Sequence, residues 1–367
     1  MPERTDQLSI VVCGAGNIGS PLADQLARHP GVARLVIIDL DTYTPENVKG
    51  QAISLSDIHR SKAVATAGRA NRIAGSRLLA EGILADLIDV PWGVYRQADV
   101  VLSCLDSRGD RAVLSAICWR LGRPLIDTGV NADLGLARVT IYLPLGSGPC
   151  YLCSIGANEQ LEARYHCNGQ RLEPPSTNAP ASLGTLAACL AMDELARVLD
   201  GRTGPDQSGR EIVFDLRNSR VTVTSQRPNP GCPFDHEAWV VLEGLVNPSS
   251  TLANALDLGS NGSGGDPSST LVVEGKRFIV AMTCPSCGRT TPWGPFLLGR
   301  LGLGRKCRQC QTPLVVTGFD MRDRLDATLP AAVLRRSLRS LGFRAGDVFT
   351  VARAAGETHY LIGEPHG

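Results

Sequence analysis

The feature that most constrains the fold is a glycine-rich turn between an apolar strand and a helix near the start of the chain. The stretch Ile10–Gly19 reads Ile-Val-Val-Cys-Gly-Ala-Gly-Asn-Ile-Gly, a helix is predicted from Ser20, and a second apolar run ends at Asp39. Glycines permit positive φ and close approach to a phosphate, and a helix N-terminus offers free N–H groups. The stretch therefore predicts a nucleotide-binding βαβ unit. The turn residues expected to bind the cofactor are Gly14, Gly16, Asn17 and Gly19.

An acidic residue ends the second strand of this unit. Asp39 lies 20 residues after Gly19, where dinucleotide-binding proteins carry a carboxylate that accepts hydrogen bonds from ribose hydroxyls. NAD and ATP both contain a ribose, so the βαβ unit alone fits either nucleotide.

Two further charged residues distinguish the nucleotides. Asp106 ends a predicted apolar strand over 99–106, and a carboxylate facing a polyphosphate is favourable when Mg²⁺ lies between them. Lys62 lies in the first turn of a helix predicted over 61–73, which is unfavourable for the helix dipole but well placed for a phosphate. These residues favour ATP with Mg²⁺, and they make Lys62 and Asp106 candidate catalytic residues.

Composition limits the class of protein. The chain has 367 residues, 43% of them hydrophobic, and a net charge of +1. This length allows a large domain and a smaller one, and the balanced charge provides no strong field for nucleic acid or an acidic membrane surface. The N-terminal residues lack a signal-peptide pattern, and no apolar run approaches the roughly 20 residues that span a bilayer. We therefore expect a cytoplasmic protein without a nucleic-acid or membrane partner.

The order of the predicted elements indicates an α/β fold in two domains. Alternating strands and helices followed by antiparallel strands predict a Rossmann-like, doubly wound, mostly parallel sheet with an antiparallel extension, over residues 1–245. Residues 246–270 are rich in Asn, Ser and Gly, which is typical of a flexible linker. Residues 271–367 are expected to form a small β-rich zinc-ribbon domain.

Six of the twelve cysteines form three Cys-x-x-Cys pairs. In a reducing compartment this spacing indicates zinc rather than disulfides. The pairs are Cys150/Cys153, Cys284/Cys287 and Cys307/Cys310, and Cys307 follows Cys287 by 20 residues. The last two pairs predict a zinc ribbon.

Taken together, the motifs resemble the E1-like (ThiF/MoeB/ubiquitin-activating) adenylyltransferase family over about residues 8–236. They are Gly14–Gly19, Asp39–Asp41, Asn47–Gln51, Lys62, Cys104–Ser107 and Cys150–Cys153. The resemblance implies that ATP with Mg²⁺ adenylates the C-terminal glycine carboxylate of a ubiquitin-like protein, releasing pyrophosphate. A sulfur-carrier protein or a peptide is the alternative substrate, and the resemblance also implies a homodimer.

The resemblance assigns roles to the matching residues. Asp39 would bind the ribose, Asn47 and Lys62 the phosphates, and Asp106 the Mg²⁺. Where the family has Asn-x-x-Arg-Gln, this chain has Gly50 in place of the arginine. The neighbouring Lys49 is therefore expected to supply the positive charge. The remaining expected cofactor-binding residues are Asp41, Lys49 and Gln51.

Cys167 is the third candidate catalytic residue, in an irregular stretch over 154–181. In the family a cysteine of this crossover loop can accept the activated acyl group as a thioester or act as a persulfide partner, and His166 suits a reactive thiolate. The alternative is a loop cysteine without a role, or an extra metal ligand.

Relatives pair the first Cys-x-x-Cys with a second one downstream, where this chain has one cysteine and a histidine. We expect a Cys₃His zinc site and a separate Cys₄ site, both structural because four protein ligands close the coordination sphere. The ligands are Cys150, Cys153, Cys232 and His236 for the first, and Cys284, Cys287, Cys307 and Cys310 for the second. An alternative pairing joins Cys150/Cys153 with Cys284/Cys287.

Several functions stay open at this point. An E1-like enzyme could serve a ubiquitin-like modifier, with the ribbon recognising the modifier or a conjugating (E2-like) protein, or it could serve a sulfur carrier. From other classes, an NAD-dependent oxidoreductase would have no use for Asp106 or Lys62. A non-catalytic nucleotide-binding scaffold is suggested by Gly50, because the family's phosphate-binding arginine is absent there.

Overall fold

The computed structural model describes residues 7–144, 146, 148–155, 179–259, 268–300 and 305–364. The chain forms two compact units. The N-terminal unit comprises Met1–Val90, Val94–Glu162 and Glu173–Ala238, and the C-terminal unit comprises Pro91–Gly93, Ala163–Leu172 and Trp239–Gly367.

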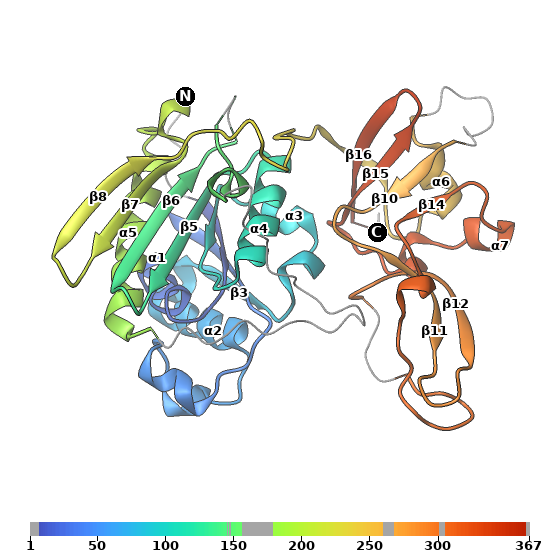
Figure 1. Cartoon of the computed structure of the whole chain (residues 1–367), viewed down its shortest axis with the longest axis horizontal. Coiled ribbons are helices and arrows are strands. Elements are labelled where there is room, and N and C mark those ends of the chain that lie inside the picture. Colours follow the sequence, from blue (N-terminus) through green and yellow to red (C-terminus); the bar gives the residue numbers. More distant parts are fainter. Residues whose placement is uncertain are drawn as a thin grey trace. The chain divides into compact units, whose positions relative to one another are not determined.

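An eight-stranded sheet with the order β3-β2-β1-β4-β5-β6-β7-β8 forms the centre of the N-terminal unit (Figure 1). β3, β2, β1, β4 and β5 run parallel, and β6, β7 and β8 extend the sheet antiparallel. This confirms the predicted fold class. The strands are β1 (Leu8–Cys13), β2 (Val32–Ile38), β3 (Leu79–Ile83), β4 (Val100–Ser103), β5 (Leu125–Asn131), β6 (Leu136–Tyr142), β7 (Arg210–Asp215) and β8 (Arg220–Ser225).

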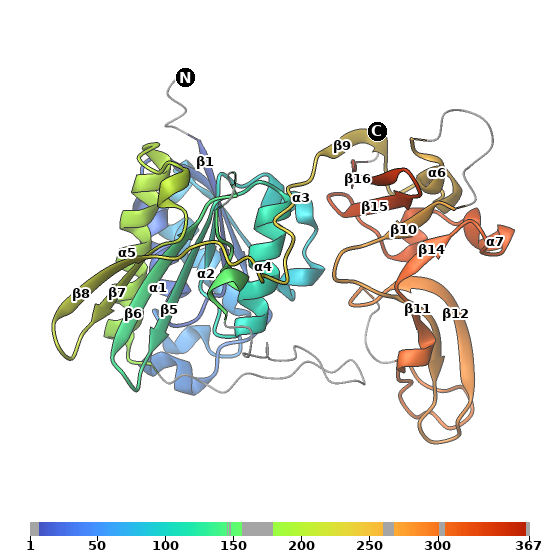
Figure 2. The same ribbon diagram turned by 45° about the horizontal axis from the view of Figure 1, so that its top comes forward.

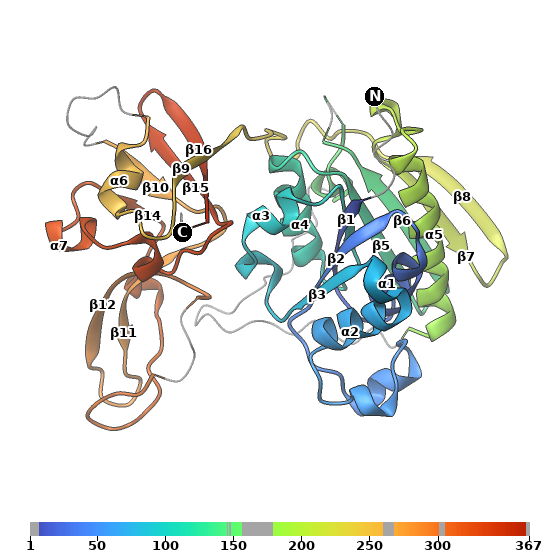
Figure 3. The ribbon, with the colours of Figure 1, turned by 180° about the vertical axis from the view of Figure 1, so that it is seen from behind.

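Helices cover both faces of this sheet. Seen from behind, α1, α2 and α5 lie over one face, and α4 lies over the other (Figure 3). The helices are α1 (Gly19–Arg28), α2 (Lys62–Ala74), α3 (Trp92–Arg96), α4 (Arg108–Arg120) and α5 (Ala181–Leu199). Short 3-10 helices are η1 (Pro45–Lys49), η2 (Leu55–Asp57), η3 (Gly75–Arg77), η4 (Leu87–Asp89), η5 (Tyr151–Ser154) and η6 (Pro205–Gln207).

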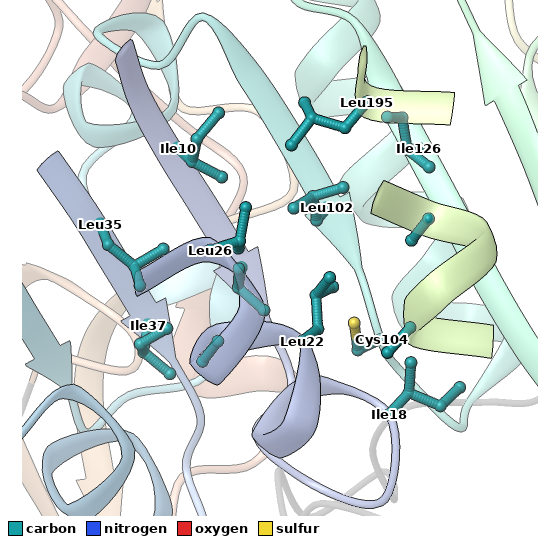
Figure 4. Packing of buried hydrophobic residues seen from close by; sticks show 14 of the residues in the cluster. Ile10, Ile18, Leu22, Leu26, Leu35, Ile37, Leu102, Cys104, Ile126 and Leu195 are labelled. Atoms are coloured by element: carbon teal, nitrogen blue, oxygen red, sulfur yellow. The ribbon is translucent and has the colours of Figure 1, made fainter. Parts of the chain in front are cut away.

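The main core lies between the sheet and the layer formed by α1, α2 and α5 (Figure 4). Ile10 of β1 and Leu102 of β4 are fully buried and belong to the same cluster as Leu22 and Leu26 of α1. β1 is the middle one of the five parallel strands, and its apolar run is buried on both faces, as expected for a parallel strand covered by helices. This packing fixes the glycine turn that follows β1.

The C-terminal unit contains two smaller sheets, with orders β14-β10-β15-β16-β9 and β12-β11-β13. β11 and β12 form a long antiparallel hairpin (Figure 2). The strands are β9 (Val241–Val246), β10 (Thr270–Val272), β11 (Phe278–Thr283), β12 (Thr290–Leu297), β13 (Met321–Arg322), β14 (Arg324–Asp326), β15 (Val348–Arg353) and β16 (Gly356–Ile362). The helices are α6 (Leu252–Asp257), α7 (Ala331–Leu334), η7 (Gly318–Asp320) and η8 (Leu338–Leu341).

The segment expected to be a linker contains ordered structure. α6 buries Leu252, Ala255 and Leu256 in the core of the C-terminal unit, and β9 pairs with β16. By its internal contacts, the C-terminal unit therefore includes residues upstream of residue 246. The predicted bounds of the functional domains stay a proposal. None of the helices among the described residues combines the length and apolarity that a bilayer crossing requires.

Candidate functional site

The turn after β1 is shaped by two glycines that touch backbone. Gly14 has φ +95°, and a Cβ added there would lie 2.5 Å from the carbonyl oxygen of Cys104. A Cβ on Gly19 would lie 1.8 Å from the Gly14 carbonyl oxygen. Gly16 is different, because the nearest atom to its added Cβ would be Gln51 Nε2 at 4.0 Å. The outer glycines therefore allow tight packing, and the middle one leaves the turn open.

The same packing brings two loops together. Gly14 follows β1, and Cys104 follows β4, its neighbour in the sheet. From β1 the chain passes to β2 on one side, and β4 lies on the other side. This is a topological switch point, where open α/β sheets bind ligands beyond the carboxyl ends of their strands.

Two acidic side chains and one lysine lie close together at the end of β2. Asp39 accepts hydrogen bonds from the backbone N–H groups of Ala15 at 2.7 Å and Asp41 at 2.8 Å. Burial raises the pKa of the Asp39 carboxyl. Lys62 Nζ donates to Asp41 Oδ2 at 2.9 Å. Burial alone would lower the pKa of Lys62, but the nearby Asp39 and Asp41 carboxylates outweigh it and raise that pKa. The structure thus brings Asp39, Asp41 and Lys62 together.

The loop through η1 lies against the glycine turn. Asn47 Oδ1 accepts from the Thr44 N–H at 2.9 Å and so caps η1. Asn17 Nδ2 donates to the carbonyl oxygens of Gly50 at 2.5 Å and Ala179 at 3.0 Å. A Cβ on Gly50 would lie 3.0 Å from the Ala179 oxygen. The glycine that replaces the family arginine therefore stands where the loop is tightly packed.

Two other side chains of this loop differ in their surroundings. Lys49 is exposed, while the Gln51 Oε1 atom is buried and has no hydrogen-bond partner within the described residues. A buried acceptor without a donor is unusual. Because the Gln51 side chain lies beside open Gly16, a hydroxyl or amino group of a bound nucleotide could supply the donor. These residues fit a nucleotide.

Asp106 is exposed beyond β4 and borders a pocket of about 550 Å³. The pocket lies against β5, β6 and β7 and the first turn of α4. Its polar lining is Asp106, Arg108, Arg111, Asn131, Arg138, Tyr151, Ser154, Glu211 and Gln226. The lining joins a carboxylate suited to a divalent cation with arginines suited to a carboxylate.

A buried charge network underlies this pocket, and sequence analysis missed it. Asp127 of β5 is fully buried and accepts hydrogen bonds from Ser103 Oγ at 2.7 Å, Arg111 Nη1 at 2.7 Å and Arg138 Nη2 at 2.9 Å. Arg138 also lies 3.6 Å from Glu211. The available signal was an acid inside the apolar strand predicted over 124–129. Asp127 therefore fixes the positions of two pocket arginines, Arg111 and Arg138, through hydrogen bonds to its buried carboxylate.

The first predicted zinc set is brought together in the N-terminal unit. Cys150 Sγ lies 3.9 Å from Cys153 Sγ and 3.7 Å from Cys232 Sγ, and Cys153 Sγ lies 3.2 Å from His236 Nε2. Tetrahedral zinc with Zn–S bonds of about 2.3 Å separates sulfurs by about 3.8 Å. All four ligand atoms lie within 4.8 Å of one another. This geometry supports the Cys₃His set over the alternative pairing with the ribbon cysteines.

The surroundings of this cluster hold its ligands in place. Hydrogen bonding with Cys150 lowers the pKa of Cys153 to about 4. The Arg120 guanidinium binds both oxygens of Asp235, at 2.6 and 2.8 Å, and packs on Phe234 at 4.7 Å. The Trp119 ring lies edge-on to His236. These contacts anchor the loop that carries Cys232 and His236.

The second predicted set lies in the C-terminal unit. Cys284 Sγ is 3.3 Å from Cys310 Sγ, and Cys287 Sγ is 3.7 Å from Cys307 Sγ. These four sulfurs also lie within 4.8 Å of one another. The knuckle between β11 and β12 and the knuckle that follows β12 therefore form a set that fits a Cys₄ zinc site.

Cys167 lies outside the described residues, so its assignment as a catalytic residue stays a prediction.

The similarity to known proteins covers the N-terminal unit. A sequence profile of the ThiF family matches residues 3–234. Among curated proteins, "Adenylyltransferase and sulfurtransferase MOCS3-1" of Zea mays is 31% identical over 243 residues, which are 65% of this chain and 49% of the relative. The MOCS3 protein of Bos taurus is 28% identical over 238 residues, covering 62% and 48%. The chain spans about half the length of these curated relatives.

Solved structures share the fold. The crystal structure of E. coli MccB with MccA-N7isoASN superposes with a TM-score of 0.51 at 18% identity, covering 64% of this chain and 68% of that chain. E. coli MccB alone gives 0.50 at 19% identity, covering 63% and 66%.

Proposed function

We propose, on the premise that this chain belongs to the ThiF family, that it is an E1-like adenylyltransferase. Its substrate is the C-terminal glycine carboxylate of a ubiquitin-like or sulfur-carrier protein. A carboxylate oxygen attacks the α-phosphorus of ATP, the bond to the bridging oxygen breaks, and pyrophosphate leaves with the electron pair. The product is an acyl adenylate.

The observation that carries this proposal is the contact of Gly14 with Cys104, because it sets the nucleotide turn beside the loop of Asp106. In-line attack on phosphorus brings negative groups together, so catalysis depends on cations and hydrogen-bond donors. Asp39 and Asp41 would bind the ribose. Lys62, Asn47 and Lys49 would contact the phosphates, with Gln51 and the glycine turn around them.

Asp106 would hold Mg²⁺, which neutralises charge between the carboxylate and the phosphates when bound. The pocket beside Asp106 is the proposed place for the C-terminal segment of the carrier. Arg108 and Arg111 on its wall would attract the terminal carboxylate and orient it toward the nucleotide.

The finer features belong to the same proposal. Both cysteine sets would hold structural zinc, since each offers four ligands and leaves no open position. Cys167 would accept the acyl group in a later step, a homodimer would be the assembly, and the C-terminal unit would recognise the carrier or an E2-like partner. The sulfur-carrier alternative is favoured by the relatives, whose names combine adenylyltransferase with sulfurtransferase.

The test begins with calorimetric binding of ATP with Mg²⁺ and of NAD(H). We expect micromolar ATP binding that weakens in Asp106→Ala, and no binding of NAD(H). The matched control is Asp133→Ala, which removes an exposed carboxylate outside the pocket. Tight NAD(H) binding that ignores Mg²⁺ and Asp106 would contradict the proposal.

Turnover separates the enzyme from a nucleotide-binding scaffold. We expect exchange of labelled pyrophosphate into ATP only when a ubiquitin-like carrier ending in glycine is added. The same carrier with an amidated C-terminus should give none, because it has no carboxylate to attack the phosphorus. ATP binding without exchange for any such carrier would favour the scaffold.

A further inference from the structure

The charge of the chain is unevenly distributed. Between Glu274 and Asp320 the sequence has seven basic residues and no acidic one, although the whole chain has a net charge of +1. This segment contains the β11–β12 hairpin and both cysteine knuckles of the Cys₄ set (Figure 2). This segment therefore carries a local positive charge that the overall balance conceals.

Two of these basic side chains have acidic partners. Arg277 lies 2.7 Å from Asp323, and Arg300 lies 2.8 Å from buried Asp347. Four others are exposed and lie beside the knuckle cysteines. We call them the knuckle surface: Arg289, Arg305, Lys306 and Arg308.

The knuckle surface is compact because the cysteine sulfurs of the two knuckles lie close together. Cys287 and Cys307 approach to 3.7 Å, Arg289 follows the first by two residues, and Lys306 precedes the second. In the part of the chain that the structure describes, Arg289, Lys306 and Arg308 form no ion pair. Four thiolates around Zn²⁺ carry a formal charge of 2−, which offsets only part of the 3+ that Arg289, Lys306 and Arg308 carry together. A positive surplus faces solvent.

An aromatic side chain projects from the same sheet region. Phe319 is 100% exposed, and it lies in η7, whose Asp320 accepts hydrogen bonds from Thr317 and from Thr283 at 3.1 Å. Thr283 ends β11 and directly precedes Cys284. The Phe319 backbone is therefore fixed beside the first knuckle, while its ring has no covering side chain.

The residues between the cations indicate the kind of partner. They are small or polar, namely Ser286, Gly288, Gln309 and Gln311, all exposed. Protein interfaces have an apolar core and are depleted in lysine, whereas interfaces with nucleic acid are polar and strongly positive. Single-stranded bases also stack on exposed aromatic rings.

We propose that the knuckle surface and Phe319 bind single-stranded nucleic acid, with the cations on the phosphates and the Phe319 ring stacked on a base. This differs from the expectation drawn from net charge, because that expectation averaged the basic segment between Glu274 and Asp320 with an acidic remainder. The proposal is independent of the adenylation reaction, so each can fail without the other.

The test is fluorescence anisotropy with the zinc-loaded full chain and labelled oligo(U) RNA or oligo(dT) of about 12 nucleotides, near the site size of single-strand binders. Affinity should fall with salt between about 50 and 200 mM, with a logarithmic slope of about −0.7 per phosphate contacted. The combined variant Arg289→Gln, Lys306→Gln and Arg308→Gln should lose about tenfold or more in affinity and show a flatter slope.

The matched control changes three exposed arginines of the N-terminal unit. Arg217→Gln, Arg220→Gln and Arg227→Gln together alter the net charge equally and should leave binding unchanged. Phe319→Ala should weaken binding about fivefold or more, and Phe319→Trp should retain it, since both aromatic rings stack. Zinc content and circular dichroism check that each variant is folded.

Three results would overturn the proposal. They are no binding by the unaltered protein at about 50 mM salt, equal losses in the knuckle and control variants, and competition by poly-L-glutamate as strong as that by the oligonucleotide. The last result would assign the surface to an acidic protein instead. Full binding by Phe319→Ala would refute the stacking step.

Discussion

Asp127→Asn tests whether the pocket rests on a buried charge network. The Asp127 side chain is 1% exposed and lies 2.7 Å from Arg111, whose side chain is 9% exposed. Removing one partner of a buried ion pair costs about 3–5 kcal/mol, because the other charge is left uncompensated. Arg138 is 29% exposed and also lies near Glu211, and asparagine keeps one acceptor. We therefore expect a loss at the lower end, about 3 kcal/mol.

The assay is thermal unfolding of the full chain, following the transition of the N-terminal unit. For a unit of this size, about 3 kcal/mol corresponds to a fall of roughly 6–12 °C in its melting temperature. Asp215→Asn is the matched control, because Asp215 accepts hydrogen bonds from Arg217 and Asn218 in an exposed turn. Its effect should be much smaller. An Asp127→Asn loss no greater than that of Asp215→Asn would refute the reasoning, since the carboxylate would then not be compensating buried charge.

Four further predictions follow from the site and the metal sets. Carboxylates raise the pKa of Lys62 despite its burial, so the stabilisation by its ion pair should be present below pH 10.5 and disappear as the pH rises through the higher pKa of the folded state. By urea unfolding, Lys62→Met should therefore be less stable than the unaltered protein at pH 8 and equally stable above the folded-state pKa of Lys62. Gly14→Ala places a Cβ 2.5 Å from a backbone oxygen at positive φ, so it should cost about 1–3 kcal/mol and weaken ATP binding by calorimetry. Gly50→Arg places a Cβ 3.0 Å from the Ala179 oxygen, so it should destabilise the fold by about 1 kcal/mol and lower the melting temperature by a few degrees. It should not tighten ATP binding. Metal analysis should find two zinc ions per chain, one lost in Cys232→Ala and the other in Cys310→Ala, and both kept in Cys189→Ala, which removes an exposed cysteine outside either set.

Local patterns made much of the fold predictable. The glycine turn, the apolar run of β1 and the position of Asp39 depend on short sequence spacings, and each specifies its own backbone conformation. The ribbon cysteines are similar, because two Cys-x-x-Cys knuckles contribute their ligands whatever surrounds them. His236 was identified through the resemblance, since spacing alone does not connect it with Cys150 across more than eighty residues.

Tertiary register explains what sequence analysis missed. Asp127 meets Arg138 because β5 and β6 pair with Gly129 opposite Arg138, and it meets Arg111 because α4 packs on that face of the sheet. Neither relation is encoded in a local period. The composition of residues 246–270 concealed α6 for a different reason: Leu252, Ala255 and Leu256 have helical spacing, but Asn, Ser and Gly dominate the window around them.

The replacement at Gly50 links the packing of the site to its charge. Asn17 donates to the Gly50 carbonyl and holds the loop against the turn, so the backbone occupies space that the first atoms of an arginine side chain would need. The cation that the family places there must then come from elsewhere. Lys49 is exposed on the same loop, and Lys62 is paired with Asp41. If Asp41 turns to the ribose on nucleotide binding, the Lys62 ammonium is released toward the phosphates. The proposed site would thus couple ribose recognition to the delivery of the half-buried Lys62 ammonium, and a ribose-lacking triphosphate should bind without the contribution of Lys62.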